Sequence, residues 1–253
     1  MIYDLQKAMI WKRISAWLFD AILMGILVVG LGFCLSSILN YDSYSETVDG
    51  RFQAIEEQYH TNLSMSLSEY ENLLPEQKEA YEQASEAFAS DEVAGRAYGI
   101  MINLTMVISS LSSLAAFLIL EFAVPLWLHN GQTLGKKIFS IGVMSVNGVR
   151  VSAVQMFIRT VLGKFTIETM IPLLVGTLVF FGSLGFYGTL VLLGLFVLQL
   201  VLLGVTRTNS LIHDLLAKTV VVDLPSQMIF ESESEMLEYK SRMKAEMEAR
   251  QDD

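Results

Sequence analysis

The stretch FTIETMIPLLVGTLVFFGSLGFYGTLVLLGLFVLQLVLLGV, from Phe165 to Val205, decides the fold. A helix needs about 20 mostly apolar residues to cross the roughly 30 Å hydrocarbon core of a bilayer. This run has about twice that length, so one crossing does not account for it. The Gly-rich segment FFGSLGFYG (Phe180–Gly188) can turn the chain midway. The stretch therefore predicts two consecutive transmembrane helices.

Two further apolar runs precede this stretch. Ile14–Leu39 is interrupted by Asp20, and Ile100–Leu128 is interrupted by Asn103 and Glu121. The whole chain is 53% hydrophobic and only 17% charged, whereas soluble domains are about 25% charged. The first run is too long for the apolar core of a signal peptide, and no A-x-A-like site follows it, so we expect an uncleaved anchor. The sequence thus predicts an all-α membrane protein with four transmembrane helices.

The distribution of Lys and Arg predicts the orientation of these spans. Basic residues gather in 1–13, in 129–164 and after 206, whereas residues 40–97 hold three Lys or Arg against 13 Asp or Glu. Positive residues favour the cytoplasmic side, so both termini are predicted to be cytoplasmic (N-in/C-in) and residues 40–97 extracytoplasmic. The acidic loop has two readings: it serves topology and solubility, or it gathers cations or a partner.

Local patterns predict structure on both sides of the bilayer. Pro75–Ala89 begins with Pro and continues with strong helix formers, so the external loop is expected to be helical. Lys136–Ala153 alternates and holds an Asn147-Gly148 pair, which predicts a β-hairpin; Lys218–Leu224 predicts a strand that could join it in a small cytoplasmic sheet. The expected organisation is a lead-in and first span (1–39), an acidic extracytoplasmic helical loop (40–97), a second span (98–128), a cytoplasmic hairpin and interfacial helix (129–164), the third and fourth spans (165–206), and a cytoplasmic strand with a charged helical tail (207–253).

Three stretches together resemble the RDD family of membrane proteins. They are WKRISAWLFDAILMGIL (Trp11–Leu27), NGQTLGKKIFSIGVMSVNGVRVSAVQMFIR (Asn130–Arg159) and NSLIHDLLAKTVVVD (Asn209–Asp223). The resemblance implies that the one Arg and two Asp of the family name are Arg13, Asp20 and Asp214. It also implies a multi-pass protein of the bacterial plasma membrane with a loosely defined activity. Transport has been suggested for the family; some members are linked to cation/proton exchange and others to membrane protein quality control.

Three acidic residues lie within the predicted spans, namely Asp20, Glu121 and Glu168. An ionisable group at mid-span costs roughly 2.5–3.5 kcal/mol on insertion scales. At 1.5 Å per residue, Asp20 and Glu121 lie about 10–12 Å from the cytoplasmic boundary. If they meet, they would share a proton or bind a cation such as Na⁺. The alternative is that each is satisfied separately, with Asp20 paired to Arg13 on the same helix face.

Proline follows two of these acids by four residues, as Pro125 and Pro172. A helical proline leaves the carbonyl four residues earlier without its hydrogen bond. The carbonyls of Glu121 and Glu168 could therefore join their carboxylates as ligands of a hard cation, or neighbouring groups could satisfy them.

Other polar residues favour structural roles. Arg13 and Asp214 both fall at the cytoplasmic boundary, and we hypothesise that they form an ion pair. Lys136 and Lys137 are predicted to contact anionic lipid headgroups, because GQTLGKK lacks the spacing of a phosphate-binding loop. His213 is expected to pack or cap, and Cys34 to act as a small hydrophobic residue.

Two functions remain open from the sequence. The first is proton-linked transport of a small cation (H⁺ or Na⁺) through Asp20 and Glu121 with support from Glu168, which also predicts a homo-oligomer because four helices barely enclose a path. The second is a non-catalytic scaffold or regulatory subunit that holds a membrane-protein partner. The sequence contains no catalytic or metal-ligating motif and no basic aromatic face for nucleic acid. We therefore expect no enzymatic activity, cofactor, metal site or nucleic-acid partner.

Overall fold

The computed structural model describes residues 6–128 and 130–251, and the side chains among them up to residue 246. It is 74% helical, and four of its helices are long and apolar enough to cross a membrane: Ile10–Ile38, Glu92–Trp127, Ala153–Phe180 and Gly185–Val205. The four predicted spans are therefore confirmed, while the N-in/C-in orientation stays a prediction. Residues 1–5 of the expected lead-in and His129 at the start of the predicted cytoplasmic segment lie outside the described residues.

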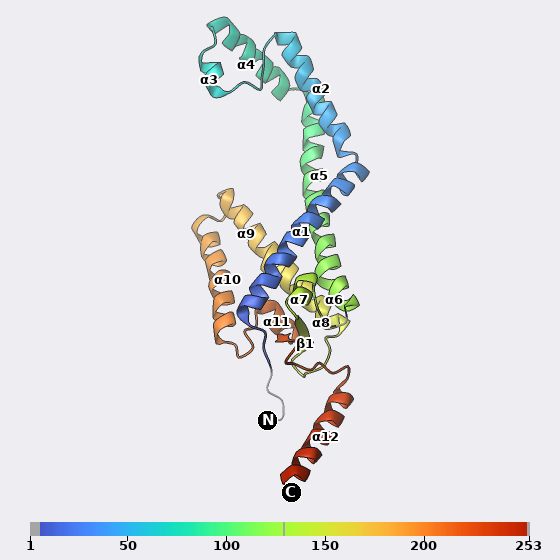
Figure 1. Ribbon diagram of the computed structural model, residues 1–253. Coiled ribbons are helices and arrows are strands. Elements are labelled where there is room, and N and C mark those ends of the chain that lie inside the picture. The colour runs from blue at the N-terminus through green and yellow to red at the C-terminus, as the bar shows by residue number, and fades with distance from the viewer. Residues whose placement is uncertain (1–5, 129, 252–253) are drawn as a thin grey trace. The chain divides into compact units, whose positions relative to one another are not determined.

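Two spans are built from several consecutive segments. The first span is α1 (Ile10–Ile38), and the fourth is α10 (Gly185–Val205). The second joins α5 (Glu92–Phe117), η1 (Leu118–Ala123) and α6 (Val124–Trp127). The third joins α8 (Ala153–Phe157), η2 (Ile158–Met170) and α9 (Ile171–Phe180). The third span therefore begins within the segment expected to be a separate interfacial helix, which continues into it without a break. Figure 1 shows α9 and α10 as a hairpin.

The chain divides into two compact units, of which the smaller is Val28–Ser113. It holds the predicted helical loop as α2 (Tyr41–Tyr59), α3 (Leu67–Glu71) and α4 (Pro75–Ala89). Helices α2 and α4 pack against each other through Phe52 and Phe88, whose ring centroids lie 5.1 Å apart at 90°. Ser66 and Glu69 form a capping box at the start of α3, which satisfies backbone donors that the helix leaves free.

The larger unit comprises residues through Leu27 and from Leu114 onward. It contains a two-stranded antiparallel sheet of β1 (Ile141–Ser145) and β2 (Thr219–Asp223), together with α7 (Leu134–Ile138), α11 (Ile212–Ala217) and α12 (Glu233–Gln251). The lead-in runs along β2, where Ala8 donates its backbone N–H to the Val221 carbonyl at 3.1 Å. In Figure 1 the elements α6, α7, α8 and α11 lie around β1.

The expected hairpin is only partly present. The turn at Asn147-Gly148 forms, with Gly148 at φ +87° and its N–H donating to the Ser145 carbonyl. The returning leg makes one isolated bridge to β1, between Met144 and Arg150, and the strand paired along the length of β1 is β2. The leg ends early because Ser152 caps the start of α8. The hairpin prediction was therefore wrong about its second strand, whereas the small sheet is confirmed.

Wide helical turns precede both span prolines. The N–H of Val124 donates to the carbonyl of Ile119, and that of Ile171 to Thr166, which are π-type bonds over five residues. Pro125 and Pro172 follow directly and have no N–H to continue the ladder. Such π segments often occur at functional sites, and here they carry Glu121 and Glu168.

Glycine permits two close approaches in the larger unit. Gly163 on η2 lies against α11, and a Cβ there would stand 2.5 Å from the Cβ and 2.7 Å from the Cα of His213. Gly135 on α7 lies against the backbone carbonyl of Ala16 in α1. Any side chain at these positions would separate the elements that they join.

We predict that Gly163→Ala destabilises the protein by about 1–3 kcal/mol, the usual cost of overpacking. The added methyl group meets backbone as well as side-chain atoms of α11. Thermal unfolding of the purified protein in detergent provides the measurement. Gly204→Ala in α10 is the matched control, because nothing lies within 4 Å of a Cβ there. Equal unfolding temperatures for the two variants would contradict the prediction.

Candidate functional site: a buried ion cluster beside a polar cavity

Asp20 on α1 is buried and bonded to the segment that precedes and begins α7. Its Oδ2 accepts a hydrogen bond from Thr133 Oγ1 at 2.5 Å, and its Oδ1 accepts one from the Gly135 N–H at 2.8 Å. Both carboxylate oxygens are therefore occupied by neutral donors. Within the described residues, Asp20 forms no ion pair with Arg13.

Glu121 on η1 pairs with Lys164 on η2, whose Nζ lies 2.6 Å from Glu121 Oε2. The backbone carbonyl of Glu121 accepts a hydrogen bond from Thr160 Oγ1 at 2.7 Å. This is the carbonyl that Pro125 would leave free in a regular α-helix. A neighbouring helix thus satisfies both polar groups of Glu121 that the sequence suggested as cation ligands.

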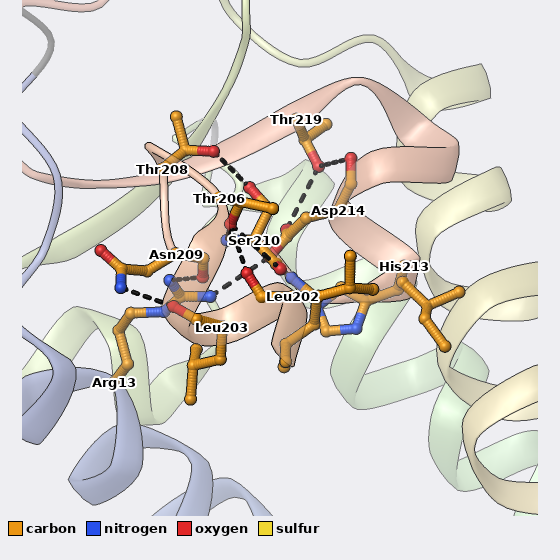
Figure 2. A network of polar contacts seen from close by, with 12 residues as sticks. Arg13, Leu202, Leu203, Thr206, Thr208, Asn209, Ser210, His213, Asp214 and Thr219 are labelled. Atoms are coloured by element: carbon orange, nitrogen blue, oxygen red, sulfur yellow. Dashed lines mark hydrogen bonds and ion pairs between the residues drawn. The ribbon is translucent and has the colours of Figure 1, made fainter. Parts of the chain in front are cut away.

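Asp214 on α11 accepts from two guanidinium groups. Arg159 Nη1 lies 2.5 Å from its Oδ1, and Arg13 Nη2 lies 3.2 Å from its Oδ2. Arg13 also donates to the Asn209 carbonyl at 2.5 Å, so its side chain spans the loop before α11, as Figure 2 shows. The distance between Arg13 and Asp214 is that of the ion pair hypothesised from the sequence. The second partner of Asp214, Arg159, was not predicted from the sequence, and its side chain is only 2% exposed.

The charge of Asp214 is strongly favoured in this setting. Burial by itself would raise the pKa of this carboxyl, but the surrounding cationic groups, Arg159 foremost, outweigh it and hold the pKa far below its usual range. Asp214 is therefore a permanent anion, and the two arginines are held in place by its charge.

His213 links this ion pair to Glu168. Its Nδ1 lies 2.7 Å from Glu168 Oε2, and its backbone N–H donates to Glu168 Oε1 at 3.0 Å. Its Nε2 lies 3.2 Å from Arg159 Nη2. Because an arginine can only donate, we assign the acceptor role to Nε2 and the proton to Nδ1, which describes neutral histidine. Burial, with Arg159 adding to it, also lowers the pKa of His213.

These groups adjoin a cavity of about 240 Å³ within the larger unit. All four spans contribute to its wall. Its charged and titratable lining residues are Arg13, Asp20, Glu121, Lys136, Arg159, Lys164 and His213, and its apolar ones are Ile10, Ile14, Trp17, Ile141, Leu203, Leu211 and Val221. The structure thus brings Asp20 and Glu121 to one cavity, while Glu168 lies on a second cavity with Gln199 and Pro172.

Lys136 differs from the other basic residues of the cavity. It is only 9% exposed, and its Nζ has no hydrogen bond or ion pair among the described residues. Every fully enclosed side-chain nitrogen or oxygen of the described residues has a hydrogen-bond partner. Because Lys136 Nζ has none, it is not fully enclosed, and it faces the open space of the cavity that it lines. Burial lowers the pKa of Lys136 to about 7, and the charges of Lys164 and Arg159 contribute. Lys137 is exposed, so the two lysines proposed for headgroup contact have different surroundings.

Sequence reasoning identified the acids of this site but not most of their partners. Arg159 and Lys164 are 55 and 43 residues away in sequence from Asp214 and Glu121, and no local periodicity relates them. Across the described residues, no group of three or more His, Cys, Asp or Glu side chains is arranged to hold a metal ion.

We predict that Asp214→Asn lowers the free energy of unfolding by about 3–5 kcal/mol, because removing one partner leaves buried charges uncompensated. Arg13→Gln should rescue the folded yield only in part, since Arg159 stays unpaired. The matched control is Asp223→Asn, which breaks the half-exposed Lys12–Asp223 pair and should cost at most about 1 kcal/mol. Monodisperse yield and thermal unfolding in detergent report the effect, and equal losses for both Asn variants would count against it.

Comparison with known proteins agrees with this architecture. No curated protein and no solved structure matches the chain. The model of the RDD family matches residues 7–218, which include the ion cluster, all four spans and every lining residue of the cavity except Val221. This protein therefore belongs to the RDD family.

Proposed function

We propose that the protein transports a small ion across the membrane and couples this movement to that of a proton. The observation that carries the proposal is the cavity to which every span contributes and which is lined by the ammonium group of Lys136, for which no described residue supplies a partner. Ionisable groups are costly within a membrane and mark ion or proton pathways. A pKa of about 7 allows Lys136 to gain or lose a proton near neutrality, as a coupling group must.

The distribution of charge supports a mechanism in which access alternates. The Asp, Glu, Lys and Arg residues of α1 end at Asp20, those of the second span lie at Glu92, Arg96 and Glu121, and α10 has none of these four types. The stretches between the polar cavity and the other ends of the spans are thus largely apolar. Such stretches oppose leakage, so passage of an ion requires the spans to rearrange. Because four helices enclose little space, we also propose a homo-oligomer, and we place it in the bacterial plasma membrane with the cavity toward the cytoplasm.

The sequence suggested a cation as the transported ion, with Asp20 and Glu121 as its ligands. The hydrogen bonds of these carboxylates do not favour that choice, because Asp20 is occupied by Thr133 and Gly135, and Glu121 by Lys164. We therefore propose a small ion of either sign, and flux measurements decide between a cation and an anion.

We expect proteoliposomes containing the protein to show ion-dependent proton flux, measured with a pH-sensitive dye in the lumen under imposed gradients of Na⁺, K⁺ or sulfate. Lys136→Gln should abolish the flux, and Asp20→Asn and Glu121→Gln should reduce it at least tenfold. Lys137→Gln alters an exposed neighbour and serves as the matched control. Absence of flux from the unmodified protein with all three ions would overturn the transport proposal.

A second function, that of a scaffold, is favoured by the smaller unit. Its α2–α4 region is a folded helical layer with an internal Arg51–Asp91 ion pair, yet it contributes no residue to the polar cavity. The residues 40–97 that contain it carry ten more acidic than basic residues. Such a surface suits a membrane-protein partner, including one engaged in quality control or processing. Affinity purification from native membranes that returns one stoichiometric partner, lost when residues 41–90 are deleted, would favour this function.

A further inference from the structure

We infer that the polar cavity binds an oxyanion, a phosphate or carboxylate group, through the ammonium of Lys136. The inference rests on the proposed function in that it names the class of ion which occupies the same cavity. It starts from the three N–H donors of Lys136, none of which has a protein acceptor among the described residues. A buried ammonium without acceptors is costly, and a bound anion supplies them.

Further donors and positive charge lie on the same wall. Lys164 has one Nζ–H engaged by Glu121 and two that no described residue accepts. Arg159 is held in place by Asp214, Thr219 and His213, so its guanidinium contributes a fixed positive charge. Lys136, Lys164 and Arg159 thus surround one side of the space, which is the arrangement that oxyanions favour.

The carboxylates around the cavity do not cancel this charge. Four cationic residues line it, Arg13, Lys136, Arg159 and Lys164, against the carboxylates Asp20 and Glu121, a difference of 4 − 2 = +2. Including Asp214, which lies behind Arg13 and Arg159, leaves +1. Glu168 is bonded to His213 and lines a separate cavity. A cation in this space would instead stand next to two ammonium groups.

The size and the apolar wall restrict the ligand. A volume of about 240 Å³ lies below the roughly 300–1,000 Å³ typical of pockets for drug-sized ligands, so a phosphate or a small carboxylate fits. Ile14 and Trp17, which belong to the apolar lining, are 44% and 64% exposed, so the rim reaches the surface of the unit. The oxyanion can therefore be a free ion or the headgroup of an anionic lipid whose acyl chains stay outside.

Binding of the anion should be linked to a proton. The charged and titratable groups that line the cavity with Lys136 are Asp20 and Arg13 from α1, Glu121 from η1, Arg159 and Lys164 from η2, and His213 from α11. Among them Lys136 changes charge near neutrality. An oxyanion binds its protonated form, so affinity is full below pH 7 and falls as the pH rises through 7. With Lys136 as the one group that titrates, the Kd is about tenfold larger at pH 8 than at pH 6.

The first test measures thermal unfolding of the full chain in nanodiscs of phosphatidylcholine alone, titrated with sodium sulfate at constant ionic strength set with chloride. Sulfate keeps its charge from pH 6 to pH 8, so any change in affinity reports the protein. We expect the unfolding temperature to rise with the logarithm of sulfate concentration, with a Kd about tenfold weaker at pH 8. Lys136→Gln should remove the effect, Lys136→Arg should keep binding but lose its pH dependence, and Lys137→Gln should behave as the unmodified protein.

The second test distinguishes the two sources of the oxyanion. In nanodiscs that contain phosphatidylglycerol, a headgroup in the cavity would raise the unfolding temperature and remove the response to sulfate. Native mass spectrometry should then detect a retained phosphatidylglycerol that Lys136→Gln loses. A sulfate response unchanged by phosphatidylglycerol identifies a free anion as the ligand.

The inference is overturned if sulfate and phosphatidylglycerol stabilise Lys136→Gln as much as they stabilise the unmodified protein, since sulfate also acts nonspecifically on protein surfaces. These measurements are made at equilibrium and need no flux. Binding that depends on Lys136 without flux in proteoliposomes would reject transport but keep the anion site. Proton-linked flux of Na⁺ or K⁺ without such binding would reject the anion site but keep transport.

Discussion

The carboxylate of Asp214 accepts from Arg13 and Arg159, and most of the larger unit depends on this interaction. Arg13 stands at the start of the first span and Arg159 near the start of the third, while Asp214 lies on the short helix that leads into β2. One carboxylate therefore joins segments separated by about 200 and 55 residues. Because an arginine left alone in a semi-desolvated place is costly, each of the two guanidinium groups holds its span against α11. The sheet, whose β2 follows α11 directly, takes its position from the same contact.

Polar groups near the membrane also explain why backbones approach so closely here. Asp20 can reach the Gly135 N–H only because residue 135 has no side chain to press on α1. Gly163 likewise lets α11 lie close to η2, where His213 meets both Arg159 and Glu168. The wide turns of η1 and η2 then place Thr160 and Lys164 within hydrogen-bonding distance of Glu121. Each of these features satisfies a group that would otherwise be buried without a partner.

Hydropathy was sufficient to predict the four spans, and alternation was sufficient to predict β1 and β2, because both are local properties of the chain. The same local patterns predicted helices in the acidic loop. They misjudged the hairpin, because the partner of β1 comes from the far end of the chain, and they separated an interfacial helix from the third span although the two are continuous. Within the site, the costly acids were visible from the sequence. Most of their partners were not, because nothing local linked Asp20 to Thr133 or Arg159 to Asp214. Pairing of charges over long separations is a property of the folded chain.

The balance of charge explains why Lys136 is distinctive. Around the cavity, the cations Arg13, Arg159 and Lys164 stand against the carboxylates Asp20, Glu121 and Asp214, so these six charges balance. Protonated Lys136 adds one positive charge to them without forming a bond to any described residue. Its charge is thus not needed to neutralise the groups around the cavity, and its donors are not used by them. A group in this position can exchange its proton or accept an external anion with few bonds to break, because the rest of the network is already complete. Rigid pairs that hold the spans, together with a cation that no described residue engages, give the cavity both a stable wall and a site that can respond.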